Sequence, residues 1–376
     1  YAWMDKMETA NIVIIGGGIV GLSIASEISK KNDSVYLLEK NWNVGLETST
    51  RNSGVIHSGI YYPKNTLKSI LSISGNNIIY DIAKRYGIAV KRVGKIIGAM
   101  DDQEIDELEK IMKNGIENNI EGLKFLEGNE IKELEPKINF KRAIYVPSTG
   151  IIDPTDLINY FYNMSLKNNV NIVKKTEVKG IKKIKDYYEI SGISADEKFT
   201  IRSRYIINSA GLNSDKIASM VGLDIDKLGY KIHYCKGDYY RISGNTPVRM
   251  LVYPVPDRFG LGIHLTPDIY GTVRIGPNAY YVDRIDYKIE TEKNVFINLV
   301  KKYMPDIINY NIEEDFSGIR PKLQGPNEGF RDFNIKHEDD NDLFGFINLI
   351  GIESPGLTAS PAIGKYVSEM FENEVI

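Results

Sequence analysis

The chain has 376 residues, of which 42% are hydrophobic and 26% charged, a composition typical of a globular protein with two or three domains. Its 47 basic and 50 acidic residues leave a formal net charge of −3, so we do not expect it to bind nucleic acid. The single cysteine, Cys235, excludes an internal disulfide and a metal site built on several thiolates, and we expect no metal. No apolar run approaches the ~20 residues that span a bilayer.

The amino-terminal residues and the lone thiol bear on location. The polar stretch 5–9 comes before any apolar segment, which is unlike a secretory signal peptide. A single thiol fits a reducing compartment, where disulfides are rare. These features favour a cytoplasmic protein and leave open a peripheral contact with the inner face of the membrane.

The first recognisable unit of the chain spans residues 11–38. Residues 12–15 form a β-branched run typical of a buried parallel strand, and apolar residues at helical spacing follow over 19–28. A second apolar run covers 35–38. The order strand, glycine turn, helix, strand predicts a βαβ unit with parallel strands and a right-handed crossover.

The rest of the chain alternates between helical and strand patterns. We expect a glycine-rich and serine-rich loop over 48–62, helices over 64–86, 101–118 and 154–167, and strands over 170–173, 178–184 and 205–208. Residues 231–274 are rich in tyrosine and turn residues, which favours an antiparallel sheet. A last strand ending at Gly351 precedes a closing helix over 361–370.

The turn of the βαβ unit, GGGIVG from Gly16 to Gly21, matches the G-x-G-x-x-G motif of dinucleotide-binding proteins. Gly16 would permit the tight turn, Gly18 the close approach of a pyrophosphate, and Gly21 the packing of the helix on the strand. Glu39 ends the second strand at about the 20-residue offset of the acid that binds an adenosine ribose. We expect the dinucleotide, NAD or FAD, to contact Gly16, Gly18, Ile19, Val20, Gly21, Glu39 and Lys40.

Later segments of the sequence indicate that the dinucleotide is FAD and not NAD, because they resemble a known family. The stretch ETSTRNSGVIHSGIYY at 47–62 looks like the second FAD-contacting loop of D-amino-acid-oxidase-type flavoproteins. Within it, residues 52–62 are most similar to the L-2-hydroxyglutarate dehydrogenase/oxidase branch, with glycerol-3-phosphate oxidases next. The resemblance continues at 235–240, 252–257, 276–279 and 317–320 and covers essentially the whole chain. The loop SPGLTASP at 354–361 departs toward the glycerol-3-phosphate oxidase group, which leaves the substrate open.

The resemblance implies an α/β fold, α+β overall. A Rossmann-type FAD-binding domain would be discontinuous and cover 10–90, 150–225 and 320–376. A mostly antiparallel β-sheet domain for the substrate would cover 91–149 and 226–319.

Polar loop residues and small residues at strand ends suit a flavin, which needs hydroxyl and N–H donors around its pyrophosphate and ring. Residues 356–358 precede a helix whose N-terminus can face the reduced, anionic ring. Further expected FAD contacts are Thr48, Ser49, Asn52, Ser53, Val55, Val178, Ala210, Gly211, Gly356, Leu357 and Thr358.

His57 is the expected catalytic base. It is one of four histidines and follows the dinucleotide unit in a glycine-flanked loop. The imidazole pKa near 6.5 suits removal of a hydroxyl proton near neutral pH. The matching histidine of the resembling families has this role. A purely structural histidine is the alternative, in which case His264 would be the next candidate for the base.

Arg320 is the expected cation for a substrate carboxylate, because arginine offers a planar bidentate fork. It matches the carboxylate-binding arginine of the wider oxidase group. Lys236 is a further cation that could meet a distal carboxylate or phosphate, although a structural role is favoured. The expected substrate contacts are Tyr61, Tyr239, Tyr253, His264, Arg320 and Ser354.

The expected activity is FAD-dependent oxidation of a small 2-hydroxy acid, with L-2-hydroxyglutarate converted to 2-oxoglutarate by hydride transfer to flavin N5. The alternatives are oxidation of glycerol 3-phosphate, oxidation of a glycine-like or sarcosine-like amine, and a non-catalytic flavin-binding scaffold. The electron acceptor is left open among oxygen, a quinone and a partner flavoprotein.

Overall fold

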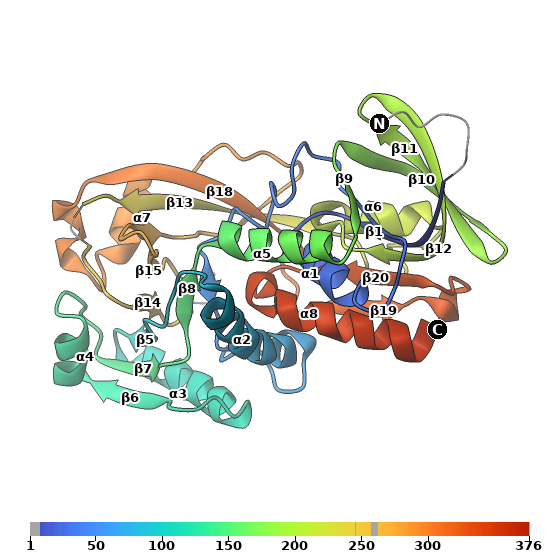
Figure 1. Ribbon diagram of the computed structural model, residues 1–376. Coiled ribbons are helices and arrows are strands. Elements are labelled where there is room, and N and C mark those ends of the chain that lie inside the picture. The colour runs from blue at the N-terminus through green and yellow to red at the C-terminus, as the bar shows by residue number, and fades with distance from the viewer. Residues whose placement is uncertain (1–7, 245, 257–261, 376) are drawn as a thin grey trace. The chain divides into compact units, whose positions relative to one another are not determined.

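The computed structural model describes residues 8–244, 246–256 and 262–375 (Figure 1). Its internal contacts divide the chain into two compact units. The first unit comprises the chain up to Thr50, Thr155–Tyr234 and the residues from Arg320 onward. The second unit comprises Arg51–Pro154 and Cys235–Ile319.

This division differs from the expected boundary near residue 90, because residues 51–90 pack with the second unit. Strand β3 (Val55–Ile56) pairs with β8 (Gly150–Ile152) of the same unit. Asn76 of α2 (Leu67–Tyr86) donates its amide to the carbonyl oxygens of His57 and Ser148, at 2.9 and 3.0 Å. Sequence periodicity does not reveal such contacts between distant segments.

The first unit is built on an eight-stranded sheet with the order β10-β11-β12-β1-β2-β9, extended by β20 on β12 and β19 on β20. Strand β1 lies parallel to both β12 and β2, as the βαβ pattern predicts. The strands are β1 Glu8–Ile15, β2 Val35–Leu38, β9 Asn171–Val173, β10 Thr176–Ile184, β11 Tyr187–Ser194, β12 Glu197–Asn208, β19 Asn334–His337 and β20 Phe346–Ile350. The helices are α1 Ile19–Ile28, α5 Pro154–Lys167, α6 Ser214–Met220 and α8 Gly356–Met370, with short turns η1 Gly211–Asn213, η3 Asp339–Asn341 and η4 Phe371–Val375.

Helix α1 packs tightly against α8, since a Cβ atom added to Gly364 would lie 2.4 Å from the hydroxyl oxygen of Ser23. The neighbouring strands β12 and β20 are also joined by buried side chains, because the amide of Asn208 donates to the side-chain oxygen of Asn348, its partner in register, at 2.8 Å. Apolar residues of the parallel strands, among them Val13 and Ile206, are completely buried in this core.

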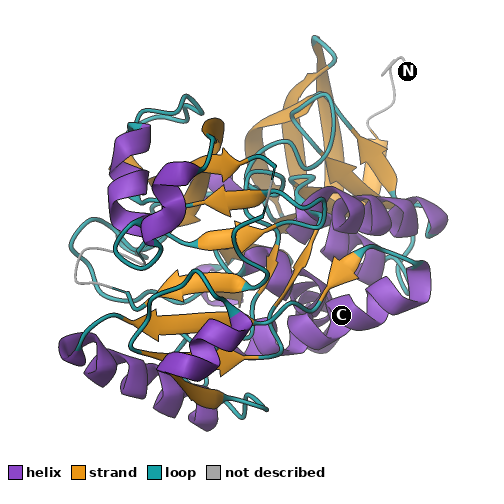
Figure 2. Ribbon diagram, turned by 90° about the vertical axis from the view of Figure 1, so that its left-hand side faces the viewer, coloured by secondary structure: helices purple, strands orange, loops and turns teal. Residues whose placement is uncertain are grey.

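The second unit contains a nine-stranded sheet with the order β17-β13-β16-β15-β14-β5-β7-β6, with β18 beside β13. A small sheet β3-β8-β4 accompanies it, and Figure 2 separates strands from helices by colour. The remaining strands are β4 Val90–Lys91, β5 Lys95–Ala99, β6 Lys124–Glu127, β7 Arg142–Val146, β13 His233–Ile242, β14 Leu251–Pro254, β15 Leu265–Pro267, β16 Val273–Ile275, β17 Tyr280–Val282 and β18 Ile312–Lys322. The remaining helices are α3 Asp102–Glu117, α4 Gly128–Leu134, α7 Lys293–Val300 and η2 Pro305–Asn309.

Pairing in the second unit's large sheet is mostly antiparallel, as predicted, but β5 and β14 run parallel. Each face of β5 joins a different apolar core. Ile96 is buried in one core and Ile97 in the other, because successive side chains of a strand point to opposite faces.

Helix α8 begins at Gly356, five residues before the expected start at Pro361. Proline lacks an N–H, so within a helix it leaves the carbonyl four residues earlier without its donor. Here that carbonyl belongs to Leu357, and the hydroxyl of Ser360 donates to it at 2.9 Å. The side chain thus compensates for the proline, and the helix continues through it.

None of the helices in the described ranges combines the length and the apolar character that a membrane crossing requires.

Candidate active site

The glycine turn between β1 and α1 has backbone geometry that larger residues would disrupt. Gly16 has a φ of +108°, and a Cβ atom there would lie 2.5 Å from the carbonyl oxygen of Ser209 at the end of β12. A Cβ atom on Gly21 would lie 2.0 Å from the carbonyl oxygen of Gly16. The first glycine therefore makes the turn, and the last allows the helix to lie against it.

The N-terminus of α1 presents backbone donors at this turn. Gly18 is the N-cap, and no side-chain cap accepts from the helix at that position in the described chain. The hydroxyl of Ser49 accepts from the N–H of Ile19 at 2.9 Å, and no acidic residue lies in the first turn. The positive end of the helix dipole is therefore not neutralised by its own residues, which suits an anion such as a pyrophosphate.

Glu39 at the end of β2 is held toward the glycine turn. Its carboxylate accepts from the N–H of Gly17 at 2.8 Å through one oxygen, and from the backbone and side-chain nitrogens of Asn41 through the other. Glu39 is 6% exposed, whereas Lys40 is exposed and forms an ion pair with Glu47 at 2.7 Å. An acid held here, beside an open helix N-terminus, fits the ribose and pyrophosphate of a dinucleotide.

The other residues expected at the cofactor are distributed over both units. Thr48 and Ser49 belong to the first unit, and Asn52, Ser53 and Val55 to the second. Asn52 accepts from the N–H of Gly54 at 2.9 Å, which shapes the loop before β3.

At the same end of the first unit's sheet as the glycine turn, Ala210 and Gly211 follow β12, and Gly211 has a φ of +53°. Gly356, Leu357 and Thr358 form the first turn of α8. Val178 is part of the first unit's apolar core.

Four side chains of the second unit gather around the expected base, and we call the five residues His57, Tyr61, Lys95, Tyr253 and His264 the base cluster. The rings of Tyr253 and His264 stack with centroids 3.5 Å apart. The Lys95 ammonium nitrogen lies 4.6 Å from the centroid of the Tyr253 ring and 4.9 Å from that of Tyr61. The structure therefore brings together four of the residues expected at the active site and adds Lys95.

Strand register explains this assembly. Strand β5 pairs with β14 so that Lys95 is opposite Leu251 and Ile97 is opposite Tyr253, which puts all four on one face of the sheet. The loop that carries His57 is fixed by the Asn76 hydrogen bond described above.

Burial lowers the pKa of both His57 and Lys95, and for His57 neighbouring charges add to the effect. Burial, the Lys95 charge and then His264 lower the pKa of His57 to about 3, although His57 as a whole residue is partly exposed. Burial lowers the pKa of Lys95 to about 7. His57 is thus a neutral imidazole throughout the physiological range, and the expected pKa near 6.5 is wrong because a desolvated cation-rich site disfavours the imidazolium.

The two tyrosines of the base cluster remain protonated. Burial raises the pKa of Tyr253 and, together with neighbouring tyrosines, that of Tyr61. Both phenols are therefore hydrogen-bond donors near neutral pH. Tyr239 on β13 contributes to the raised pKa of Tyr253 and stacks on Phe316 with centroids 4.6 Å apart.

Arg320 lies on the part of β18 that belongs to the first unit, between the buried residues Ile319 and Pro321. Strand alternation puts Arg320 and Lys322 on one face, and Lys322 is 3.7 Å from the carboxylate of Glu353. Ser354, the residue after Glu353, is exposed.

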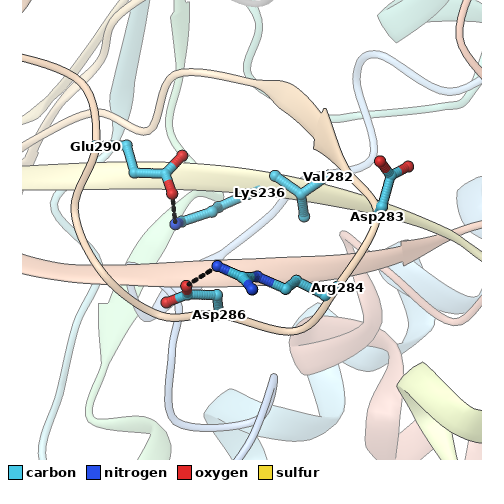
Figure 3. Close-up of a pocket in the computed structure, with 6 residues that line it drawn as sticks. All are labelled: Lys236, Val282, Asp283, Arg284, Asp286 and Glu290. Atoms are coloured by element: carbon cyan, nitrogen blue, oxygen red, sulfur yellow. Dashed lines mark ion pairs between the residues drawn. The ribbon is translucent and has the colours of Figure 1, made fainter.

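Lys236 on β13 lies away from the base cluster. Strand alternation places it on the face opposite Tyr239, where it lines a pocket of about 320 Å³ together with Val282, Asp283, Arg284, Asp286 and Glu290 (Figure 3). Its ammonium nitrogen is 3.7 Å from the carboxylate of Glu290. Three acids line this pocket, so a second anion is not favoured there, and the structural role preferred for Lys236 agrees with this geometry.

Sequence reasoning missed Lys95. It opens the apolar run KIIGA, where a lysine would ordinarily mark the solvent-exposed end of a strand. In the structure its side chain is 0% exposed. A lysine at the start of a run that is otherwise entirely apolar was the available signal.

Comparison with known proteins decides the family. The model of the DAO family, described as FAD dependent oxidoreductase, matches residues 11–370. The chain belongs to this family of FAD-dependent oxidoreductases. FAD is accordingly its cofactor, and the glycine turn with Glu39 fits that group.

Two characterised relatives of this DAO-family oxidoreductase carry different names. It is 33% identical to a mitochondrial L-2-hydroxyglutarate dehydrogenase of Arabidopsis thaliana, over 97% of this chain and 84% of the relative. It is 34% identical to a glycerol 3-phosphate dehydrogenase of Caloramator mitchellensis, over 96% of this chain and 74% of the relative. Both branches named by the sequence resemblance are thus represented.

A solved structure supports the same fold. The FAD-bound L-alpha-glycerophosphate oxidase of Mycoplasma pneumoniae superimposes with a TM-score of 0.84 at 26% identity, covering 98% of this chain and 96% of that one. The L-proline dehydrogenase of P. horikoshii has a TM-score of 0.82 at 20% identity. The α/β architecture expected from the sequence is confirmed, and the enzyme is an FAD-dependent oxidoreductase.

Proposed function

We propose that this FAD-dependent oxidoreductase converts a small L-2-hydroxy acid into the 2-oxo acid, with L-2-hydroxyglutarate as the leading substrate. The observation that carries the proposal is the base cluster, in which His57 lies with the completely buried Lys95 among aromatic rings. Oxidation of an alcohol needs a base for the hydroxyl proton, and a carboxylate substrate needs a cationic group. The relatives that bear the name L-2-hydroxyglutarate dehydrogenase support this substrate.

In this mechanism His57 accepts the proton of the substrate's hydroxyl group while the C2–H bond of the substrate breaks. FAD, when bound, supplies the acceptor for the hydride that leaves C2. Because its pKa is low, His57 is unprotonated at every physiological pH and can accept a proton. The same low pKa means that the protonated imidazole is unfavourable in the protein without substrate. The base cluster therefore favours substrates that bring negative charge with them.

Arg320 is proposed to bind the C1 carboxylate through its guanidinium, which can donate two parallel hydrogen bonds to the two oxygens. We assign the phenols of Tyr61 and Tyr253 and the imidazole of His264 to the substrate pocket, because they surround the same buried lysine and histidine. Tyr239 and Ser354 complete the proposed substrate contacts.

Glycerol 3-phosphate is the second candidate substrate. The 34% identical relative has this activity in its name, and the loop at 354–361 resembles that group. The same base would act on an alcohol, while cations would meet a phosphate. Oxidation of a glycine-like or sarcosine-like amine is less favoured, because it needs an unprotonated amine more than a protein base.

Anaerobic mixing tests the proposal directly. The purified FAD-containing protein is mixed separately with L-2-hydroxyglutarate, glycerol 3-phosphate and sarcosine, and the flavin absorbance is followed. Rapid bleaching by L-2-hydroxyglutarate alone is the expected result. Bleaching by glycerol 3-phosphate alone would replace the substrate, and bleaching by none of the three would contradict oxidation of this substrate class.

A further inference from the structure

Lys95 of the base cluster is a buried lysine for which the described residues provide no anionic partner. The Lys95 side chain is 0% exposed, and its nitrogen finds no hydrogen-bond acceptor in the described part of the chain. An ammonium group has three N–H donors, and desolvating it is costly unless a partner compensates. Lys236, also 0% exposed, differs because the carboxylate of Glu290 lies 3.7 Å away.

The aromatic rings beside Lys95 do not replace an anion. The faces of Tyr61 and Tyr253 lie within the distance at which a cation is attracted to a ring. A ring face has no lone pair for the three donors and no net charge. The rings would instead hold the ammonium group in position by cation–π attraction, while its N–H donors remain available to hydrogen-bond another group.

The position of Lys95 links this group to the reaction. After burial, the Lys95 charge is the largest cause of the lowered pKa of His57. The two side chains are therefore coupled by electrostatic repulsion between their charged forms. On the same sheet face, Ile97 and Leu251 are completely buried apolar residues that exclude water from this side. A cation in such a setting binds an anion more strongly than one on the surface.

We propose that Lys95 binds the second anionic group of the substrate, the one remote from the reacting hydroxyl. The inference rests on the proposed function, in which His57 takes the hydroxyl proton and Arg320 binds the first anionic group. The shared chemistry is a carboxylate or a phosphate at the far end of a short hydroxylated chain.

Binding of that anion would also change His57. Once a negative group neutralises Lys95, the imidazolium of His57 is no longer repelled by an uncompensated cation, and its pKa rises toward the ordinary value. A substrate with the remote anion thus obtains a stronger base than a substrate without it. Lys95 would couple recognition of the substrate to proton removal.

The test uses ligands that cannot react, so that it is independent of turnover. Glutarate, with two carboxylates, and butyrate, with one, are titrated by calorimetry into the FAD-containing protein and into Lys95→Met. Lys95→Met removes a buried charge and keeps an unbranched side chain of similar length, a change that folded proteins often tolerate. Lys95→Gln provides a second uncharged variant, and Lys236→Met is the matched control for loss of a buried lysine. Flavin content and circular dichroism verify the fold of each variant.

The expected result is a loss of about ten- to a hundredfold in glutarate affinity for both Lys95 variants, the contribution of a charged hydrogen bond. Butyrate affinity should stay within a factor of about three, and Lys236→Met should bind both ligands like the wild type. Inorganic phosphate, titrated in parallel, distinguishes the two sources of the anion. Loss of phosphate binding with unchanged glutarate binding assigns Lys95 to a phosphate substrate, and the reverse assigns it to a dicarboxylate.

Unchanged glutarate and phosphate affinities in both Lys95 variants would overturn the assignment, and so would an equal loss for glutarate and butyrate. A wild-type protein that binds none of the three ligands would overturn it as well. Failure of the proposed function has a different signature, because then no hydroxy acid bleaches the flavin while the titrations still report the anion site.

Discussion

The imidazole of His264 lies flat against the phenol ring of Tyr253, with centroids 3.5 Å apart and planes only 7° from parallel. The strand register produces this stack. Strands β14 and β15 are antiparallel with Val252 opposite Leu265, so Tyr253, the next residue of β14, lies beside His264, the residue that precedes β15. The stack fixes the plane of an imidazole that, after Lys95, also disfavours a charged His57. Lys95 and His264 therefore lie on the same face of the sheet as Tyr253, and their effect on the pKa of His57 shows that its loop lies close to them.

Removing the base should slow flavin reduction without removing the flavin. His57→Ala should purify yellow, because it leaves unchanged the glycine turn and Glu39, which we expect to hold FAD. Reduction by the substrate should slow by about 10²–10⁴-fold, the usual contribution of general-base catalysis, in stopped-flow absorbance measurements. His233→Ala, a histidine of the first unit, is the control. A wild-type rate in His57→Ala would make His57 structural and His264 the next base to test.

Acid should destabilise the protein through His57. Its pKa is about 3 in the folded protein and about 6.5 in the unfolded chain, so the unfolded chain binds more protons between these values. The contribution of the neutral His57 to the free energy of unfolding is fully present above about pH 6.5, and it is lost as the pH falls toward 3. From about pH 7.5 to about pH 5.5, the wild type should lose roughly 1 kcal/mol more unfolding free energy than His57→Ala in urea denaturation. Equal losses would mean that the folded imidazole titrates normally.

Anion affinity should fall as the pH rises through the titration of Lys95. Its pKa of about 7 in the free protein means that the ammonium is charged below this pH and neutral above it. The side chains that face it are the neutral imidazole of His57, the imidazole of His264, which stacks on Tyr253, and the protonated phenols of Tyr61 and Tyr253. Glutarate affinity, measured by calorimetry, should therefore weaken about tenfold for each pH unit well above 7. This slope should vanish in Lys95→Met, and its persistence there would assign it to another group.

An acid in the glycine turn should prevent cofactor binding. In Gly18→Asp a carboxylate would stand beside Ser49 at the open N-terminus of α1 and compete with the pyrophosphate, so the protein should purify colourless. Gly128→Asp is the matched control, because Gly128 starts α4, is exposed and has no atom within 4 Å of its added Cβ. Released flavin is quantified after denaturation. FAD retention in Gly18→Asp would contradict the assignment of this turn to the pyrophosphate.

Substrate affinity should depend on the bidentate geometry of the Arg320 guanidinium as well as on its positive charge. Arg320→Lys should weaken the apparent affinity for the hydroxy acid, and Arg320→Met should weaken it by about ten- to a hundredfold, the value of a charged hydrogen bond. Arg284→Met, at a side chain that is 85% exposed, serves as the control. The affinities come from the substrate dependence of flavin reduction. Unchanged kinetics in Arg320→Met would move the C1 carboxylate to another cation.

The amino-acid sequence by itself determined the dinucleotide unit. The strand, the glycine turn, the helix and Glu39 are contiguous, so their geometry follows from local backbone rules that a sequence pattern records. The observed β1, α1 and β2 agree with the prediction, and the family comparison confirms FAD. The alternation of strands and turns after residue 231 likewise predicted the antiparallel sheet, because side-chain period and turn residues are local properties.

Only the tertiary structure decided which side chains surround the base. His57, Lys95, Tyr253 and His264 come from four separate segments, and strand register and the Asn76 contact bring them together. Periodicity could not reveal that Lys95 is buried and finds no acceptor among the residues that the structure describes, since a lysine at a strand end would usually reach water. Nor could it give the pKa of His57, because desolvation and neighbouring charge depend on distances between residues that are far apart in the chain.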